Sequence, residues 1–167
     1  KQVVLKYQMS WPGSGDPYYT LEGLDRRTYY GVNAVPNMFV DGGWDDNTNS
    51  YTSGLRDAFY DVPSFMDISS EIRVECKTVF VDVTITPYKD FPGNNVLHAA
   101  VIEKKTFNNV STNGETEFDN VMKKMMPDAN GTVIGPLTKG QPQTITLNYT
   151  FQGNYILPPN ANSPVNH

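Results

Sequence analysis

The sequence has very little of the chemistry on which most enzymes depend. It contains one cysteine and two histidines among 167 residues. One cysteine cannot form an internal disulfide. His98 lies in an expected strand and His167 at the end of the chain, which leaves too few parts for a Ser-His-Asp or His-metal site. No G-x-x-x-x-G-K phosphate loop is present. The lack of a catalytic constellation favours a non-enzymatic role.

Clustered positive charge is also missing. The net charge is −5 at pH 7, and the longest basic runs are pairs of residues, at Arg26-Arg27, Lys104-Lys105 and Lys123-Lys124. Phosphate backbones are bound by groups of Lys and Arg. Nucleic acid is therefore not an expected partner.

Long hydrophobic runs are absent as well. A membrane-spanning helix needs about 20 apolar residues, and no stretch of the sequence approaches that length. No basic-then-apolar signal segment precedes Lys1. The chain starts without Met inside a strand-like sequence and ends in loop-like sequence, so we interpret it as a fragment of a longer protein.

The first third of the sequence alternates strand and helix signals. Residues 3–8 predict a short strand. Asp16-Pro17 predicts a helix start, because Asp can accept hydrogen bonds from free N–H groups of the first turn and Pro needs no donor there. The helix is expected to continue to about Tyr29, with Gly31 as its stop. Its expected apolar face consists of Tyr18, Leu21, Leu24 and Thr28.

Two further elements complete this part. A strand is expected over residues 35–41, entered through Val35-Pro36, and a helix over residues 51–60. Between them lies a polar loop rich in Gly, Asp and Asn.

From about residue 64 onward the hydrophobic period changes to two. Ile72, Val74 and Cys76 alternate with charged residues, and Val79 to Ile85 repeats the pattern, which predicts an antiparallel hairpin with one buried face. Further strands are expected at 96–104, 120–126 and 143–151, and this series is typical of a β-sandwich. We therefore expect an α+β protein with two domains, residues 1–62 and 63–167.

The order of these elements resembles the outer-membrane-protein-related family of Bacteroidota, in which a thioredoxin-like domain precedes an immunoglobulin-like β-sandwich. The matching segments are Asp16-Pro17-Tyr18, residues 27–32, Val35-Pro36 with Asp41-Gly42, residues 100–103, and residues 121–127 followed by Gly131. The resemblance implies an incomplete thioredoxin-like domain and a sandwich that lacks its final strand. It also implies a location in the cell envelope, associated with the outer membrane or secreted.

Val35 and Pro36 are the first candidate site residues. In thioredoxin-like proteins a cis-proline loop leaves the backbone of the preceding residue free to pair with an extended substrate. The resemblance therefore implies peptide binding at Val35-Pro36. The alternative is that Pro36 only shapes the entry of the strand.

Three other candidate sites have weaker patterns. Asp41, Asp45 and Asp46 offer oxygen ligands for calcium, although their spacing is not that of an EF-hand and polar residues also favour turns. Trp11 and Trp44 could stack on a glycan, although aromatic residues more commonly belong to a core. Cys76 is expected to lie on the buried strand face and to be inert. No other cofactor is expected.

The preferred interpretation is a non-enzymatic, surface-associated interaction module that binds protein or peptide on a redox-inactive thioredoxin-like scaffold. Two alternatives remain open. One is an exported thiol-disulfide oxidoreductase, whose Cys-x-x-C would lie in a segment that precedes Lys1. The other is a glycan-binding β-sandwich protein.

Overall fold

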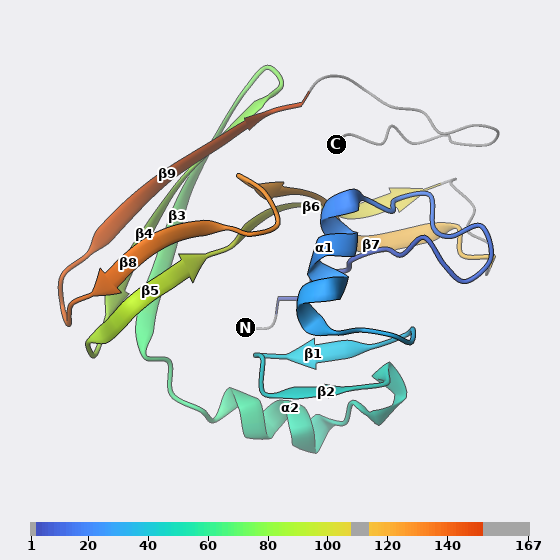
Figure 1. Cartoon of the computed structure of the whole chain (residues 1–167), viewed down its shortest axis with the longest axis horizontal. Coiled ribbons are helices and arrows are strands. Elements are labelled where there is room, and N and C mark those ends of the chain that lie inside the picture. Colours follow the sequence, from blue (N-terminus) through green and yellow to red (C-terminus); the bar gives the residue numbers. More distant parts are fainter. Residues whose placement is uncertain (1–2, 108–113, 152–167) are drawn as a thin grey trace.

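The computed structural model describes residues 3–107 and 114–151, which form mostly antiparallel β-structure with two short helices (Figure 1). The elements in chain order are α1 (Leu21–Tyr30), β1 (Met38–Val40), β2 (Trp44–Asp46), the 3-10 turn η1 (Thr48–Ser50), α2 (Ser53–Tyr60), β3 (Met66–Glu75), β4 (Thr78–Pro87), β5 (Phe91–Leu97), β6 (Ala99–Phe107), β7 (Glu117–Met126), β8 (Thr132–Leu137) and β9 (Gln143–Thr150). The expectation of a mixed fold that is rich in β-structure is confirmed.

Helix α1 starts later than the sequence predicts. Its N-cap is Thr20, whose hydroxyl accepts the N–H of Gly23 at 3.0 Å. Asp16 instead accepts the N–H of Tyr18 at 2.9 Å, so Asp16-Pro17 forms a turn, and the prediction of a helix start there is wrong. Gly31 ends the helix as predicted, in the left-handed conformation at φ 67°.

The buried face of α1 also differs from the expectation. Leu21, placed on the apolar face by its spacing, is exposed, and the buried residues of the helix are Gly23 and Arg26. The shift follows from the later helix start, because Tyr18 is buried as part of the preceding turn and not of the helix.

A small hairpin and a second helix follow. β1 pairs with β2 antiparallel, from Met38↔Asp46 to Val40↔Trp44. α2 begins after Thr52, whose hydroxyl accepts the N–H of Leu55 at 3.2 Å, and the prediction of a helix over residues 51–60 is confirmed to within two residues. In the expected strand at residues 3–8 the structure forms only a single bridge, Lys6↔Val121.

The predicted hairpin in the second half is confirmed as β3 and β4, which pair without a register shift over ten residues. β9 adds to the other edge of β4, so the sheet order is β3-β4-β9. β9 agrees with the strand expected at 143–151.

The remaining strands form one long bent ribbon. β5 and β6 are separated only by His98, β5 pairs with β8, and β6 pairs with β7. β8 is not among the predicted strands, because its Gly135-Pro136 step is typical of a loop. The bend requires glycine at position 131, where φ is 75°. A Cβ at this position would lie only 2.6 Å from the carbonyl oxygen of Leu97.

The main core lies between the three-stranded sheet and the ribbon. Its buried residues are Val81, Val83, Ile85, Met126, Leu137 and Leu147. This arrangement of one sheet against another is sandwich-like.

A second cluster joins the first residues of the chain to β7. The rings of Tyr18 and Phe118 lie 5.0 Å apart in an edge-to-face arrangement, with Val121 beside them. Lys123 is buried here, with its ammonium 2.9 Å from Glu103 and 4.1 Å from the ring centroid of Tyr18. Burial lowers the pKa of Lys123, and the Glu103 carboxylate opposes that shift. These contacts cross the predicted boundary between residues 62 and 63, and the division into two domains stays a prediction.

Cys76 is not on a buried strand face. It occupies the turn between β3 and β4 at φ 54° and is exposed. The sequence alternation places it in line with Ile72 and Val74, but the strand ends at Glu75, and Ile72 and Val74 are themselves exposed. The prediction that Cys76 is buried is therefore wrong.

None of the helices in the described ranges is long and apolar enough to cross a membrane.

Candidate functional site

A groove of about 1130 Å³ lies among the N-terminal segment, the end of α1, the segment from Val35 to Asp41, and the helical segments η1 and α2. It brings together four of the residues that the sequence singles out: Val35, Pro36, Trp11 and Asp41. Trp44, Asp45 and Asp46 are not part of its lining.

The floor of the groove is set by the chain reversal after α1. The N–H of Val32 donates to the Arg27 carbonyl at 3.1 Å, and the Arg27 Nε donates back to the Val32 carbonyl at 2.8 Å. The chain then passes through the Val35–Pro36 peptide bond, which is cis, and enters β1. The Arg27 guanidinium lies 5.1 Å from the centroid of the Trp11 ring, which fixes that ring at the groove.

One wall is the N-terminal segment. The N–H of Lys6 donates to the Asn120 carbonyl at 2.9 Å, and the N–H of Met122 donates to the Lys6 carbonyl at 3.0 Å. These two bonds attach the segment to β7. Residues 3–9 also line the groove.

The opposite wall is formed by β1 and α2. Among the described residues β1 pairs only with β2, and all three of its residues line the groove. The Phe39 ring packs against Tyr30 with 4.6 Å between the ring centroids. Tyr60, at the end of α2, is 74% exposed and adds a further aromatic surface.

The charged residues of the groove are mixed in sign. Lys6 lies 3.6 Å from Glu115, and Arg56 lies 2.7 Å from Asp57. Burial raises the pKa of Asp16 to about 6, opposed by the hydrogen bond from the Tyr18 N–H, and the charge of Glu115 adds to the increase. A groove of this kind has no strong preference for anions or cations.

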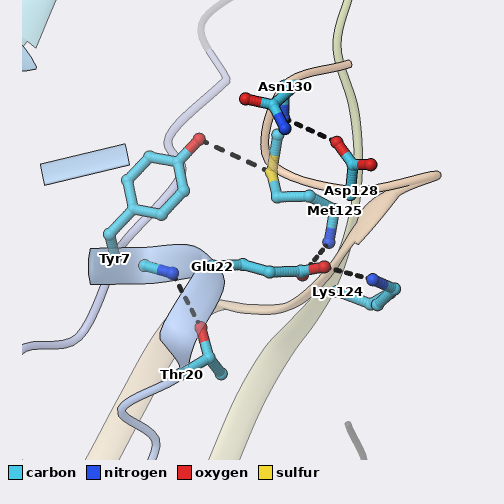
Figure 2. A network of polar contacts seen from close by, with 8 residues as sticks. Tyr7, Thr20, Glu22, Lys124, Met125, Asp128 and Asn130 are labelled. Carbon is cyan, nitrogen blue, oxygen red and sulfur yellow. Dashed lines mark hydrogen bonds and ion pairs between the residues drawn. The ribbon is translucent and has the colours of Figure 1, made fainter. Parts of the chain in front are cut away.

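The base of α1 is attached to β7 by polar contacts, which Figure 2 shows from close by. Glu22 forms an ion pair with Lys124 and accepts the backbone N–H of Met125 at 2.6 Å. The Tyr7 hydroxyl donates to the Met125 sulfur at 3.8 Å. The network therefore connects α1, the N-terminal segment and β7, and it holds the groove walls in place.

Arg26 is a buried residue whose role the sequence does not reveal. It is 4% exposed, and its guanidinium donates to the Tyr30 hydroxyl at 2.8 Å and to the Ala129 carbonyl at 3.4 Å. Beside it lies a second cavity of about 190 Å³ that includes His98. Burial and the nearby Arg26 charge lower the pKa of His98. In the sequence Arg26 is one of two adjacent arginines, Arg26-Arg27, and its spacing from the apolar residues does not indicate that it is buried.

The calcium candidates are not assembled into a ligand set. Asp41 is in the turn after β1, and Asp45 and Asp46 are exposed neighbours in β2, whose side chains point to opposite faces of the strand. The Asp46 carboxylate accepts the N–H of Asn47 at 2.6 Å. The part of the chain that the structure describes contains no group of three or more Asp, Glu, His or Cys side chains that could hold a metal ion.

The glycan candidates are also separate. Trp11 is at the groove beside Arg27, whereas Trp44 is in β2 with its ring centroid 6.3 Å from that of Tyr51. Cys76 lies outside the groove lining.

Comparisons of the chain with protein-family models, with curated proteins and with solved structures find no match.

Proposed function

We propose that this protein is a non-enzymatic interaction module that binds an extended segment of another protein in the groove beside Val35 and Pro36. The observation that carries the proposal is the groove itself, which joins these two residues to an aromatic surface from four separate parts of the chain. Concave, largely apolar sites with a few polar groups are the usual form of binding sites in proteins.

The backbone of the walls favours an extended partner. β1 pairs with β2, the N-terminal segment forms a β-bridge to β7 through Lys6, and residues of both segments line the groove. An extended peptide can add main-chain hydrogen bonds to such segments and place alternate side chains in pockets.

The side chains favour a partner with aromatic or aliphatic residues and little net charge. Rings of Tyr7, Trp11, Tyr30, Phe39, Tyr51, Phe59 and Tyr60 line the groove. Its acidic and basic groups are mixed and partly paired with each other. A polyanionic ligand would require a surplus of basic groups, which is missing here.

The finer fold description and the location belong to this proposal. We interpret residues 1–62 as thioredoxin-like and the remainder as an immunoglobulin-like sandwich. We place the protein at the cell envelope, where its partner would be a surface protein. The support is the sequence resemblance, together with the position of Val35 and Pro36 in the lining of the groove. The redox alternative requires cysteines outside this sequence, because Cys76 is the only one present and is not at the groove.

The experiment is selection of a random-peptide phage library against the immobilised full chain, followed by fluorescence anisotropy with the enriched peptides. Val35→Arg and Tyr60→Arg place a charge in the groove and should weaken binding about tenfold or more. Val133→Arg and Tyr88→Arg are matched controls, because both residues are exposed on the sandwich and do not line the groove. The controls should bind as the wild type does.

Two results would contradict the proposal. One is a selection that enriches no peptide, and the other is a set of peptides that bind the groove variants and the wild type equally. Binding of soluble oligosaccharides that is lost in Trp11→Ala, with no peptide enriched, would favour the glycan alternative.

A further inference from the structure

The strand β3 has a long edge that is unpaired in the part of the chain that the structure describes. It pairs with β4, and among the described residues no other strand pairs with it. Its ten residues contain no proline, and its register with β4 shows no bulge. Native proteins usually shorten, bulge or cover such an edge, because its free N–H and C=O groups can pair with another chain.

One face of this edge strand is apolar and exposed. Ile68 lies opposite Ile85 and Ile72 opposite Val81, so both share the face that forms the main core. Yet Ile68 is 56% exposed and Ile72 is 69% exposed, because the ribbon of β5 and β8 does not cover them. An exposed apolar stripe next to a free strand edge is typical of an interaction surface.

We infer that β3 is the docking edge for a second copy of this chain, and that two β3 strands pair antiparallel about a two-fold axis at Ser70. In this register Ile68 faces Ile72 of the second copy, and Met66 faces Val74 of the second copy. Nine of the ten β3 residues are paired, and the apolar faces of the two sheets become continuous. The contact is self-complementary, as a two-fold dimer requires.

The charges on the other face select this register. With the axis at Ser70, Asp67 faces Arg73 of the second copy, and the pair occurs twice. With the axis at Glu71, that residue would face itself and Asp67 would face Glu75, which brings like charges together. Cross-strand pairs of opposite charge stabilise a sheet, and like charges directly opposite destabilise it.

A third register, centred on Ile72, also pairs opposite charges, with Arg73 facing Glu71. It aligns only residues 69–75 and leaves Met66 and Ile68 without partners. The Ser70 register is therefore the one that satisfies both the charged and the apolar face. Because the interface is a single pair of strands, the dimer should be weak and concentration-dependent.

Charge reversal provides the first test, measured by sedimentation equilibrium of the full chain over a wide concentration range. Arg73→Asp places two pairs of like charges across the edge and should weaken dimerisation about tenfold or more. The double variant Asp67→Arg/Arg73→Asp restores opposite charges and should restore the dimer. Lys139→Asp, an exposed charge reversal between β8 and β9 and outside the groove lining, is the control and should dimerise as the wild type does.

Disulfide trapping tests the register. In a Cys76→Ser background, Ser70→Cys places two thiols directly opposite each other, at a Cα separation that a disulfide can span. Oxidised glutathione should therefore produce a covalent dimer of Ser70→Cys, and none of Glu71→Cys. A chain that stays monomeric at every concentration, a double variant that fails to recover, or cross-linking through Glu71→Cys in place of Ser70→Cys would overturn the inference.

Discussion

The strands β3 and β4 have the same alternation of apolar and polar residues, pair with each other over their full length, and still differ completely in burial. Ile85 in β4 is 2% exposed, whereas Ile68, directly opposite in β3, is 56% exposed. Alternation records which side chains share a face of a sheet. It does not record whether another layer covers that face. The core residues of β4 are covered, whereas in β3 only Met66 packs against the main core.

The cross-strand pair Ile85 and Ile68 provides the largest test of this comparison. Ile85→Ala should lower the free energy of unfolding by about 2–5 kcal/mol, because it leaves a cavity in the main core. Ile68→Ala should cost less than about 1 kcal/mol, since the side chain is mostly solvated already. Urea denaturation at low protein concentration measures both, and equal losses would contradict the difference in burial.

Two ion pairs allow the same comparison between a buried and an exposed site, and the expected effect on stability is intermediate. Lys123 is buried between Glu103 and Tyr18, whereas Arg73 and Glu75 form a pair of similar length on the exposed edge strand. Glu103→Gln leaves the Lys123 ammonium uncompensated and should cost about 1–3 kcal/mol, given that Glu103 itself is partly exposed.

The matched change Glu75→Gln should cost about 0–1 kcal/mol, because exposed pairs are screened by solvent and salt. Thermal unfolding of both variants at low and high salt distinguishes the pairs. A large salt-dependent loss in Glu75→Gln would show that the edge strand is buried in solution.

The smallest expected effect is the change of stability with pH that results from Asp16, a residue of the groove. The pKa of Asp16 is raised to about 6 from 3.8, so folding favours its protonated form. The stability from this group is fully present below the unfolded pKa and is lost as pH rises through about 6. Because Asp16 is partly solvated, we expect the loss to be about 1 kcal/mol.

Asp16→Asn is neutral at every pH and keeps an oxygen for the Tyr18 N–H. The difference in stability between the wild type and Asp16→Asn should therefore shift against the wild type between pH 4 and pH 7, by about 1 kcal/mol. Asp45→Asn, an exposed change in β2, is the control and should show no such trend. A flat difference for Asp16→Asn would contradict the raised pKa.

The sequence predicts the local parts of this molecule well. The hairpin of β3 and β4 follows from its period of two, the C-terminus of α1 from Gly31, and α2 from the pattern at residues 51–60. Each of these depends on residues near one another in the chain, so local periodicity and turn chemistry are sufficient.

The parts that the sequence did not predict depend on distant contacts. Tyr18 is buried by Phe118, and Arg26 by the loop at Ala129, and neither relation leaves a periodic signal. β8 pairs with β5 across the bent ribbon although its Gly and Pro are typical of a loop. For the site, the sequence marked Val35 and Pro36 from a motif, but the groove around them requires the N-terminal segment to attach to β7 through Lys6.

The attachment of the first thirty residues to β7 also determines when this protein can finish folding on a ribosome. Arg26 contacts Ala129, 103 positions later in the chain, and Tyr7 contacts Met125, 118 positions later. At a synthesis rate of roughly 5–20 residues per second, α1 and its flanking segments must wait about 5–20 s for their partners to be made. During that interval the Tyr-rich N-terminal segment is exposed to chaperones and to other nascent chains, whereas β3 and β4 can pair with each other as soon as both are made.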